Sequence, residues 1–174
     1  MQKKLELLGW LKSDLDKRGK TSVPVLAGMS AVEYFTNGAY TSQDIDILWS
    51  DTDILTEILA ARGFLREGRF WYNEDENIVL EVLGHSQGRN ITSVITEYGT
   101  VNILAVEEVI LDLLEGYVWA GSRDDYQWAR VLLKSALKNG TPIDMDYLRS
   151  EAQTRDIIEL LDILLSEVED ADPL

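Results

Sequence analysis

The spacing of apolar residues changes near residue 105, and this change restricts the chain to folds that combine a sheet with helices. Before that point, short apolar runs at 23–27, 70–73 and 78–83 are separated by turns, which is typical of strands. From Val106 to Tyr117 the apolar residues instead recur every three or four positions, which indicates a helix. We therefore predict an α+β fold, with a mixed sheet flanked by helices over residues 1–105 and a helical lobe packed on it over residues 106–174.

The remaining elements follow from the same spacing and from the residues that end helices. Further strands are expected at 44–49 and, as a hairpin, at 91–95 and 101–104. Helices are expected where apolar residues recur at helical spacing between Gly, Asn or Pro breaks, at 3–18, 29–35, from about 52 to Gly63, 124–138, 144–152 and 155–168.

Charge and composition narrow the functions that the chain can perform. Sixteen Lys and Arg residues stand against thirty-one Asp and Glu, a formal net charge of −15, which repels an extended nucleic acid but not a small nucleotide carried with Mg²⁺. The absence of cysteine excludes disulfides and thiolate metal sites. No signal peptide or membrane-spanning run is apparent, so we expect a soluble, cytoplasmic protein without a membrane partner.

Two acids alternate with aliphatic residues in the run Asp44-Ile-Asp-Ile47. Along a strand, Asp44 and Asp46 point the same way with their Cα atoms about 6.5 to 7 Å apart, so that both carboxylates can reach shared cations. Oxygen ligands alone suit Mg²⁺ or Mn²⁺. The alternative is an edge strand whose acids merely face water.

The segment before these acids contains a glycine between an apolar run and a helix. Gly28 follows Val25-Leu26-Ala27, and the helix begins at Met29. Such a turn exposes backbone N–H groups at a helix start and allows a phosphate to approach closely, while Ser30 can add a hydroxyl. The alternatives are an ordinary tight turn at Gly28 and a helix cap at Ser30.

The order of these features resembles the polymerase-beta-like nucleotidyltransferase superfamily, especially short bacterial and archaeal proteins related to abortive-infection toxins. Ala27-Gly28 matches the glycine pair of that family, and fifteen residues separate it from Asp44-Ile-Asp46. Glu81, on the later strand 78–83, matches the third acid. The likeness extends over about 150 residues and includes the helical half, although only the first motif is specific.

The resemblance implies a reaction and assigns roles to these residues. An acceptor hydroxyl attacks the α-phosphorus of a nucleoside triphosphate and pyrophosphate leaves, with two Mg²⁺ (or Mn²⁺) ions neutralising charge. Asp44 and Asp46 would bind the metals, Glu81 would hold the one that activates the acceptor, and the Ala27-Gly28 turn with Ser30 would bind the β- and γ-phosphates. The acceptor, whether a small molecule, a protein or an RNA end, cannot be inferred, nor can the choice between a homodimer and a separate partner protein.

Two departures from the family pattern keep other functions open. Tyr40 stands where many relatives have arginine, and Leu113 stands where many have lysine, so two phosphate-binding cations are missing. The chain can therefore also be a lapsed relative that serves as a binding or regulatory partner, for example in a toxin–antitoxin pair, or an unrelated α+β domain with surface acids. Glu81 also fits the polar face of a half-buried strand, and the lone His85 fits a turn better than a general base.

Overall fold

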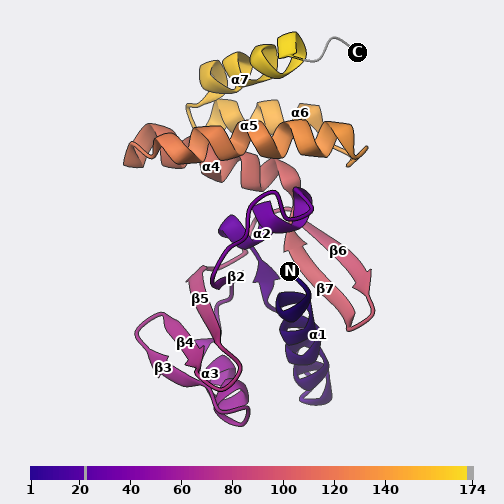
Figure 1. Cartoon of the computed structure of the whole chain (residues 1–174), viewed down its shortest axis with the longest axis vertical. Helices are drawn as coiled ribbons and strands as arrows, with labels where there is room; N and C mark the ends of the chain where they lie inside the picture. Colours follow the sequence, from indigo (N-terminus) through magenta and orange to yellow (C-terminus); the bar gives the residue numbers. More distant parts are fainter. Residues whose placement is uncertain (22, 172–174) are drawn as a thin grey trace. The chain divides into compact units, whose positions relative to one another are not determined.

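The computed structural model describes residues 1–21 and 23–171, in which helices and strands alternate up to α3, five strands follow in succession, and four helices complete the chain (Figure 1). Residues 172–174, which the sequence assigns to the helical lobe, lie outside the described residues. The elements are α1 (Gln2–Lys17), β1 (Val25–Leu26), α2 (Gly28–Phe35), β2 (Ile45–Leu48), α3 (Thr52–Ala60), β3 (Leu65–Glu67), β4 (Phe70–Asn73), β5 (Ile78–Gly84), β6 (Ile91–Thr96), β7 (Gly99–Leu104), α4 (Val106–Ala120), α5 (Arg123–Lys138), α6 (Met145–Thr154) and α7 (Ile158–Ala171).

All of these strands join one mixed sheet in the order β3-β4-β5-β2-β1-β7-β6. The central strands include both parallel pairs, β2 with β5 and β1 with β7, whereas β1 and β2 run antiparallel. The two predicted hairpins, β4 with β5 and β6 with β7, are antiparallel, and β3 adds a further antiparallel strand beside β4. The predicted α+β class is confirmed, while the short edge strand β3, whose three residues are all exposed, was not predicted.

The chain divides into two compact units. The first contains Met1–Tyr34 and Gly38–Ala105, and therefore holds the sheet with α1, α2 and α3. The second contains Phe35–Asn37 and the chain from Val106 onward, and therefore holds α4 to α7. All three predicted site carboxylates belong to the first unit.

In the first unit, α1 lies along β7 and buries one stripe of side chains (Figure 1). Leu7, Leu8, Leu11 and Leu15 are almost fully buried, and at roughly 25 cal/mol per Å² of apolar surface such a stripe is a major source of stability. Lys4 lies on the same stripe, one turn before Leu8, and is buried too. The first turn of α1 thus carries an amino group into the interior.

Strand β2 does not match the alternative in which its acids merely face water. All four of its residues, Ile45 to Leu48, are buried. The acid at position 46 therefore lies inside the unit rather than on a solvated surface. A carboxylate in such a place needs polar partners or a cation.

The second unit is a set of helices with an internal polar cluster. Glu108 on α4 is fully buried and pairs with Arg155 at 2.8 Å, while the carboxylate of Glu107 accepts a hydrogen bond of 2.6 Å from the N–H of Asp144. These contacts tie α4 to the segments at both ends of α6. No helix within the described ranges is long and apolar enough to cross a membrane.

Candidate metal centre

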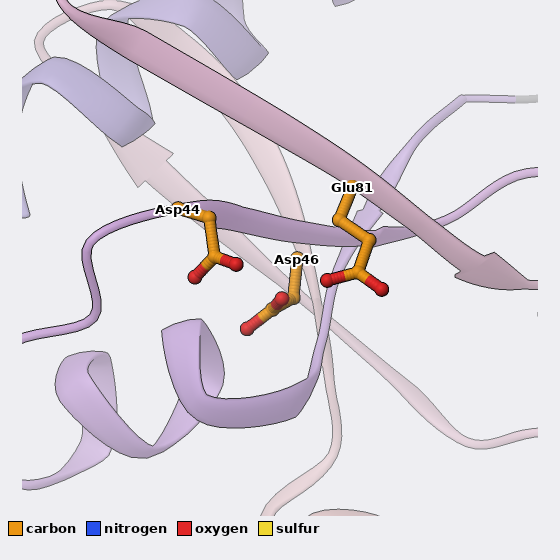
Figure 2. Close-up of side chains that lie close together, drawn as sticks. All are labelled: Asp44, Asp46 and Glu81. Carbon is orange, nitrogen blue, oxygen red and sulfur yellow. The ribbon is translucent and has the colours of Figure 1, made fainter. Parts of the chain in front are cut away.

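Three carboxylates converge on one side of the sheet, from two neighbouring strands. Asp46 on β2 and Glu81 on β5 are direct partners in a parallel pair, so their side chains emerge side by side from the same face. Asp44 stands just before β2 and two residues from Asp46. One oxygen from each of the three lies within 4.8 Å of the others, and Figure 2 shows them projecting together.

Asp46 is the most buried of the three acids, and its burial alters the pKa of the carboxyl group. Its Oδ2 accepts a hydrogen bond of 3.0 Å from the N–H of Ser30 in the first turn of α2. Burial, followed by the nearby charge of Asp44, raises the pKa of Asp46 from 3.8 to about 6. At neutral pH the carboxylate is ionised but poorly solvated, which favours uptake of a cation.

Asp44 is held through both its side chain and its backbone. Ser42 Oγ donates a hydrogen bond of 2.7 Å to Oδ1 of Asp44. The Asp44 carbonyl accepts hydrogen bonds from Lys4 Nζ at 2.5 Å and from Ser30 Oγ at 2.9 Å. These contacts fix the start of β2, so the carboxylate has little freedom to turn away from Asp46.

Glu81 retains a buried oxygen without a hydrogen bond. Its Oε1 accepts none, and the guanidinium of Arg69 approaches this oxygen as an ion pair at 2.7 Å outside hydrogen-bond geometry. A buried carboxylate oxygen in this condition is costly unless a charged group balances it. One oxygen of this carboxylate lies within 4.8 Å of an oxygen of each aspartate, which is what a metal ligand requires.

Gly28 allows the first turn of α2 to approach these acids. Its φ is +50°, and a Cβ built at this position would lie 3.0 Å from Asp46 Oδ2 and 3.0 Å from Leu83 Cδ1. Any side chain here would strain the backbone and press on the carboxylate of Asp46. The glycine predicted from the sequence is therefore required by the geometry of the site.

Replacing Gly28 with alanine should destabilise the first unit by about 1–3 kcal/mol, from the cost of a left-handed φ and from contact with Asp46. Gly19→Ala is the matched control, because Gly19 has a φ of +68° but nothing within 4 Å of its added Cβ. Chemical denaturation of both variants measures the difference. Equal losses would show that the contact with Asp46 contributes nothing.

Ala27 and Ser30, the other two residues of the predicted glycine turn, are buried and bonded to the segment that carries the two aspartates. Ala27 is buried, and its N–H donates to the carbonyl of Asp46 at 2.9 Å. Ser30 is fully buried; its hydroxyl also lies 3.0 Å from Lys4 Nζ and accepts a hydrogen bond of 3.1 Å from the N–H of Asp46. With its Oγ committed in this way, Ser30 positions the two aspartates, and this geometry does not favour the predicted phosphate contact.

Lys4 is a component of the site that the sequence reasoning missed. Its Nζ lies 3.0 Å from Glu33 Oε2, so a buried ion pair supports Ser30 and Asp44 from below. Burial raises the pKa of Glu33, but hydrogen bonds from the amino group of Met1 and from Lys4 outweigh it and leave the pKa below its ordinary value. The signal was present: Lys4 continues the helical spacing of Leu8, Leu11 and Leu15.

Tyr40 and Leu113, which stand where relatives have cations, and the lone His85 add no positive charge to the site. Tyr40 lies near the site, where burial and then the charges of Asp44, Asp46 and Glu33 raise the pKa of its phenol, so this side chain is neutral. Leu113 is buried within α4 in the second unit, and His85 is exposed just after β5. None of the three supplies a positive charge to the carboxylates in the described structure.

The donor set suits a hard divalent cation. Three carboxylates supply oxygen ligands only, and Mg²⁺ or Mn²⁺ prefers such ligands over nitrogen or sulfur. Glu81 Oε1 accepts no hydrogen bond, and burial raises the pKa of Asp46, so both carboxylates are stabilised by positive charge at the site. The three side chains therefore fit a metal site.

Comparison with known proteins supports the fold. No family model matches the chain, and no curated protein matches its sequence. Among solved structures it is similar to the crystal structure of an antigenic nucleotidyltransferase-like protein from Paracoccidioides brasiliensis, with a TM-score of 0.59 and 15% identity over 96% of this chain and 93% of that chain. The chain therefore has a nucleotidyltransferase-like fold.

Proposed function

We propose that this chain is a metal-dependent nucleotidyltransferase that moves a nucleotide from a nucleoside triphosphate to a hydroxyl acceptor. The observation that carries the proposal is the convergence of Asp44, Asp46 and Glu81 within 4.8 Å beside the glycine start of α2. Carboxylates from two strands next to a helix N-terminus combine a cation site with an anion site, as transfer from a triphosphate requires. The nucleotidyltransferase-like fold supports the same conclusion.

Each residue has a defined part in this proposal. Asp44 and Asp46 hold the divalent cation, and Glu81 holds the ion on the acceptor side. When bound, Mg²⁺ or Mn²⁺ neutralises charge on the attacking and leaving oxygens. The hydrogen bonds from Ser42 to Asp44 and from Ser30 to Asp46 fix the directions in which the two aspartates point.

The phosphates are expected at the first turn of α2. The first N–H groups of a helix have no acceptor within the helix and point out of its end, where they attract anions. Gly28 begins this helix, and its missing Cβ leaves room for the carboxylate of Asp46, so the helix start and the metal ligands lie side by side. Ala27 and the Ser30 hydroxyl support the turn from the interior.

Binding is tested by thermal unfolding with MgCl₂ and ATP, GTP, CTP or UTP. A nucleotide at a hundred times its dissociation constant should stabilise the protein by about 2.7 kcal/mol, and only when Mg²⁺ or Mn²⁺ is present. Asp44→Ala should abolish this stabilisation. Asp75→Ala, which removes an exposed acid in the turn before β5, is the matched control and should leave it intact.

Turnover is tested by pyrophosphate release with pooled small-molecule, protein and RNA acceptors. Release that requires Asp44 supports the transferase. The alternative function is a lapsed, nucleotide-binding regulatory partner, such as a component of a toxin–antitoxin pair, and the neutral Tyr40 beside the acids favours it. Metal-dependent nucleotide binding without pyrophosphate release from any acceptor would favour this alternative.

A further inference from the structure

A single arginine stands at the rim of the carboxylate cluster, on an element that the sequence did not connect with the site. Arg69 follows the turn between β3 and β4, and its Nη2 lies 2.7 Å from Glu81 Oε1. In the described residues 1–21 and 23–171, Arg69 is the cationic side chain that forms an ion pair with one of the three site carboxylates, Glu81. The other nearby cation, Lys4, is buried and bonded to Ser30 and to the Asp44 carbonyl.

The backbone of Arg69 is fixed, whereas its side chain is accessible. The Arg69 carbonyl accepts a hydrogen bond of 3.0 Å from the N–H of Val82, and the next residue, Phe70, pairs with Glu81 across β4 and β5. The guanidinium lies 5.4 Å from the centre of the Phe70 ring. The Arg69 side chain is 64% exposed and that of Glu81 only 10% exposed, so solvent reaches the arginine from the open side of the site.

The pair is poorly suited to a purely structural role. An exposed arginine contributes little to stability through an ion pair, commonly below about 1 kcal/mol. The guanidinium also leaves Glu81 Oε1 without a hydrogen bond, although bidentate geometry is the usual arrangement of arginine with a carboxylate. The contact is therefore one that a divalent cation at Glu81 can replace at low cost.

A divalent cation that is bound by three carboxylates cannot also balance the negative charge of a triphosphate. A further positive group is therefore needed beside the phosphates. Guanidinium groups bind phosphate oxygens through paired N–H donors, and they are less strongly hydrated than lysine amines. One oxygen of Glu81 lies within 4.8 Å of an oxygen of each aspartate, and the guanidinium pairs with the same carboxylate, so it borders the space that a metal-bound phosphate would enter.

We propose that Arg69 binds a phosphate group of the metal-bound nucleotide, after a divalent cation displaces its guanidinium from Glu81. This inference rests on the proposed function, because it assigns a substrate-binding residue to the same site. Arg69, in the turn between β3 and β4, would then supply the phosphate-binding positive charge that is absent at Tyr40 and Leu113.

The test compares Arg69→Ala with Arg66→Ala. Arg66 is a matched control on the same hairpin: it lies over the Trp71 ring at 4.7 Å and donates to the Gly68 carbonyl at 3.0 Å. Two titrations are needed, one of Mn²⁺ alone by electron paramagnetic resonance and one of inorganic tripolyphosphate at saturating Mn²⁺ by calorimetry. Tripolyphosphate avoids any choice of base.

For Arg69→Ala we expect Mn²⁺ affinity equal to that of the unchanged protein or several-fold higher, because a competing cation is gone. Tripolyphosphate affinity should fall at least about tenfold, since a hydrogen bond to a charged group is lost. Arg69→Lys should recover part of this loss, and Arg66→Ala should behave as the unchanged protein. Circular dichroism confirms that each variant folds.

Two results would overturn the role of Arg69. One is a tripolyphosphate affinity in Arg69→Ala that matches Arg66→Ala. The other is a loss of Mn²⁺ affinity as large as the loss of tripolyphosphate affinity, which would mean that Arg69 only orients Glu81. If the unchanged protein binds neither Mn²⁺ nor tripolyphosphate, the proposed function fails and the role of Arg69 fails with it, so the two failures are distinguishable.

Discussion

Replacing Asp46 with asparagine is expected to raise the free energy of unfolding at pH 8 in the presence of a chelator and to abolish metal-dependent stabilisation. Burial, reinforced by the charge of Asp44, raises the pKa of Asp46 from 3.8 to about 6, which corresponds to a cost on the order of 2–3 kcal/mol for keeping the carboxylate charged in the folded chain. Asparagine removes that charge and can still accept the hydrogen bond from the N–H of Ser30.

The sign of the pH dependence makes the expectation specific. The folded state binds a proton at Asp46 more tightly than the unfolded state, so the unchanged protein gains stability as pH falls through about 6 and has the full gain below 3.8. The advantage of Asp46→Asn should thus be largest above pH 7 and vanish near pH 4. Urea denaturation from pH 4 to 8 measures it.

Asp75→Asn serves as the control for this series, because Asp75 is exposed in the turn before β5. Its effect should stay within about 0.5 kcal/mol over the same pH range. An Asp46→Asn variant that loses stability at pH 8 would contradict the burial argument. A variant that keeps its Mg²⁺-dependent stabilisation would remove Asp46 from the metal site.

Replacing Lys4 with methionine is expected to lower the free energy of unfolding by about 3–5 kcal/mol, the usual cost of removing one partner from a buried ion pair. The methionine keeps most of the length of the side chain but removes the charge 3.0 Å from Glu33 Oε2 and the hydrogen bond to the Asp44 carbonyl. Chemical denaturation at neutral pH provides the measurement.

Two further variants separate charge from packing. Lys3→Met changes an exposed lysine on the same turn of α1 and should cost no more than about 0.5 kcal/mol. The double variant Lys4→Met with Glu33→Gln should be less destabilised than Lys4→Met alone, because no buried carboxylate is left without Lys4. A double variant that loses the sum of the two single effects would show that the pair does not interact.

Local sequence patterns encode where the three carboxylates stand along the chain. The alternation around Asp44 and Asp46 fixes which way they point within β2, and the apolar run around Glu81 predicts β5. The pairing of Asp46 with Glu81 was not encoded locally, because it depends on which strands become neighbours in the sheet. The resemblance to a known family supplied that link before the structure did.

The features that sequence reasoning missed involve polar residues in unusual surroundings. Lys4 is a polar side chain that the fold buries, and burial of a charged group depends on partners from distant segments such as Glu33. Arg69 carries no signal at all, since an arginine after a glycine in a turn is ordinarily solvated. Strand β3 has exposed residues only and gains its strand geometry from pairing with β4.

The register between β2 and β5 has a consequence for how sequences with this fold can vary in length. Adding or deleting one residue between Ile78 and Glu81 would reverse the direction in which Glu81 points and withdraw the third carboxylate from Asp46. The turn that joins β4 to β5 carries no such restriction, because changes in its length leave both strands paired as before. Insertions and deletions should therefore accumulate in that turn and be absent from the first half of β5.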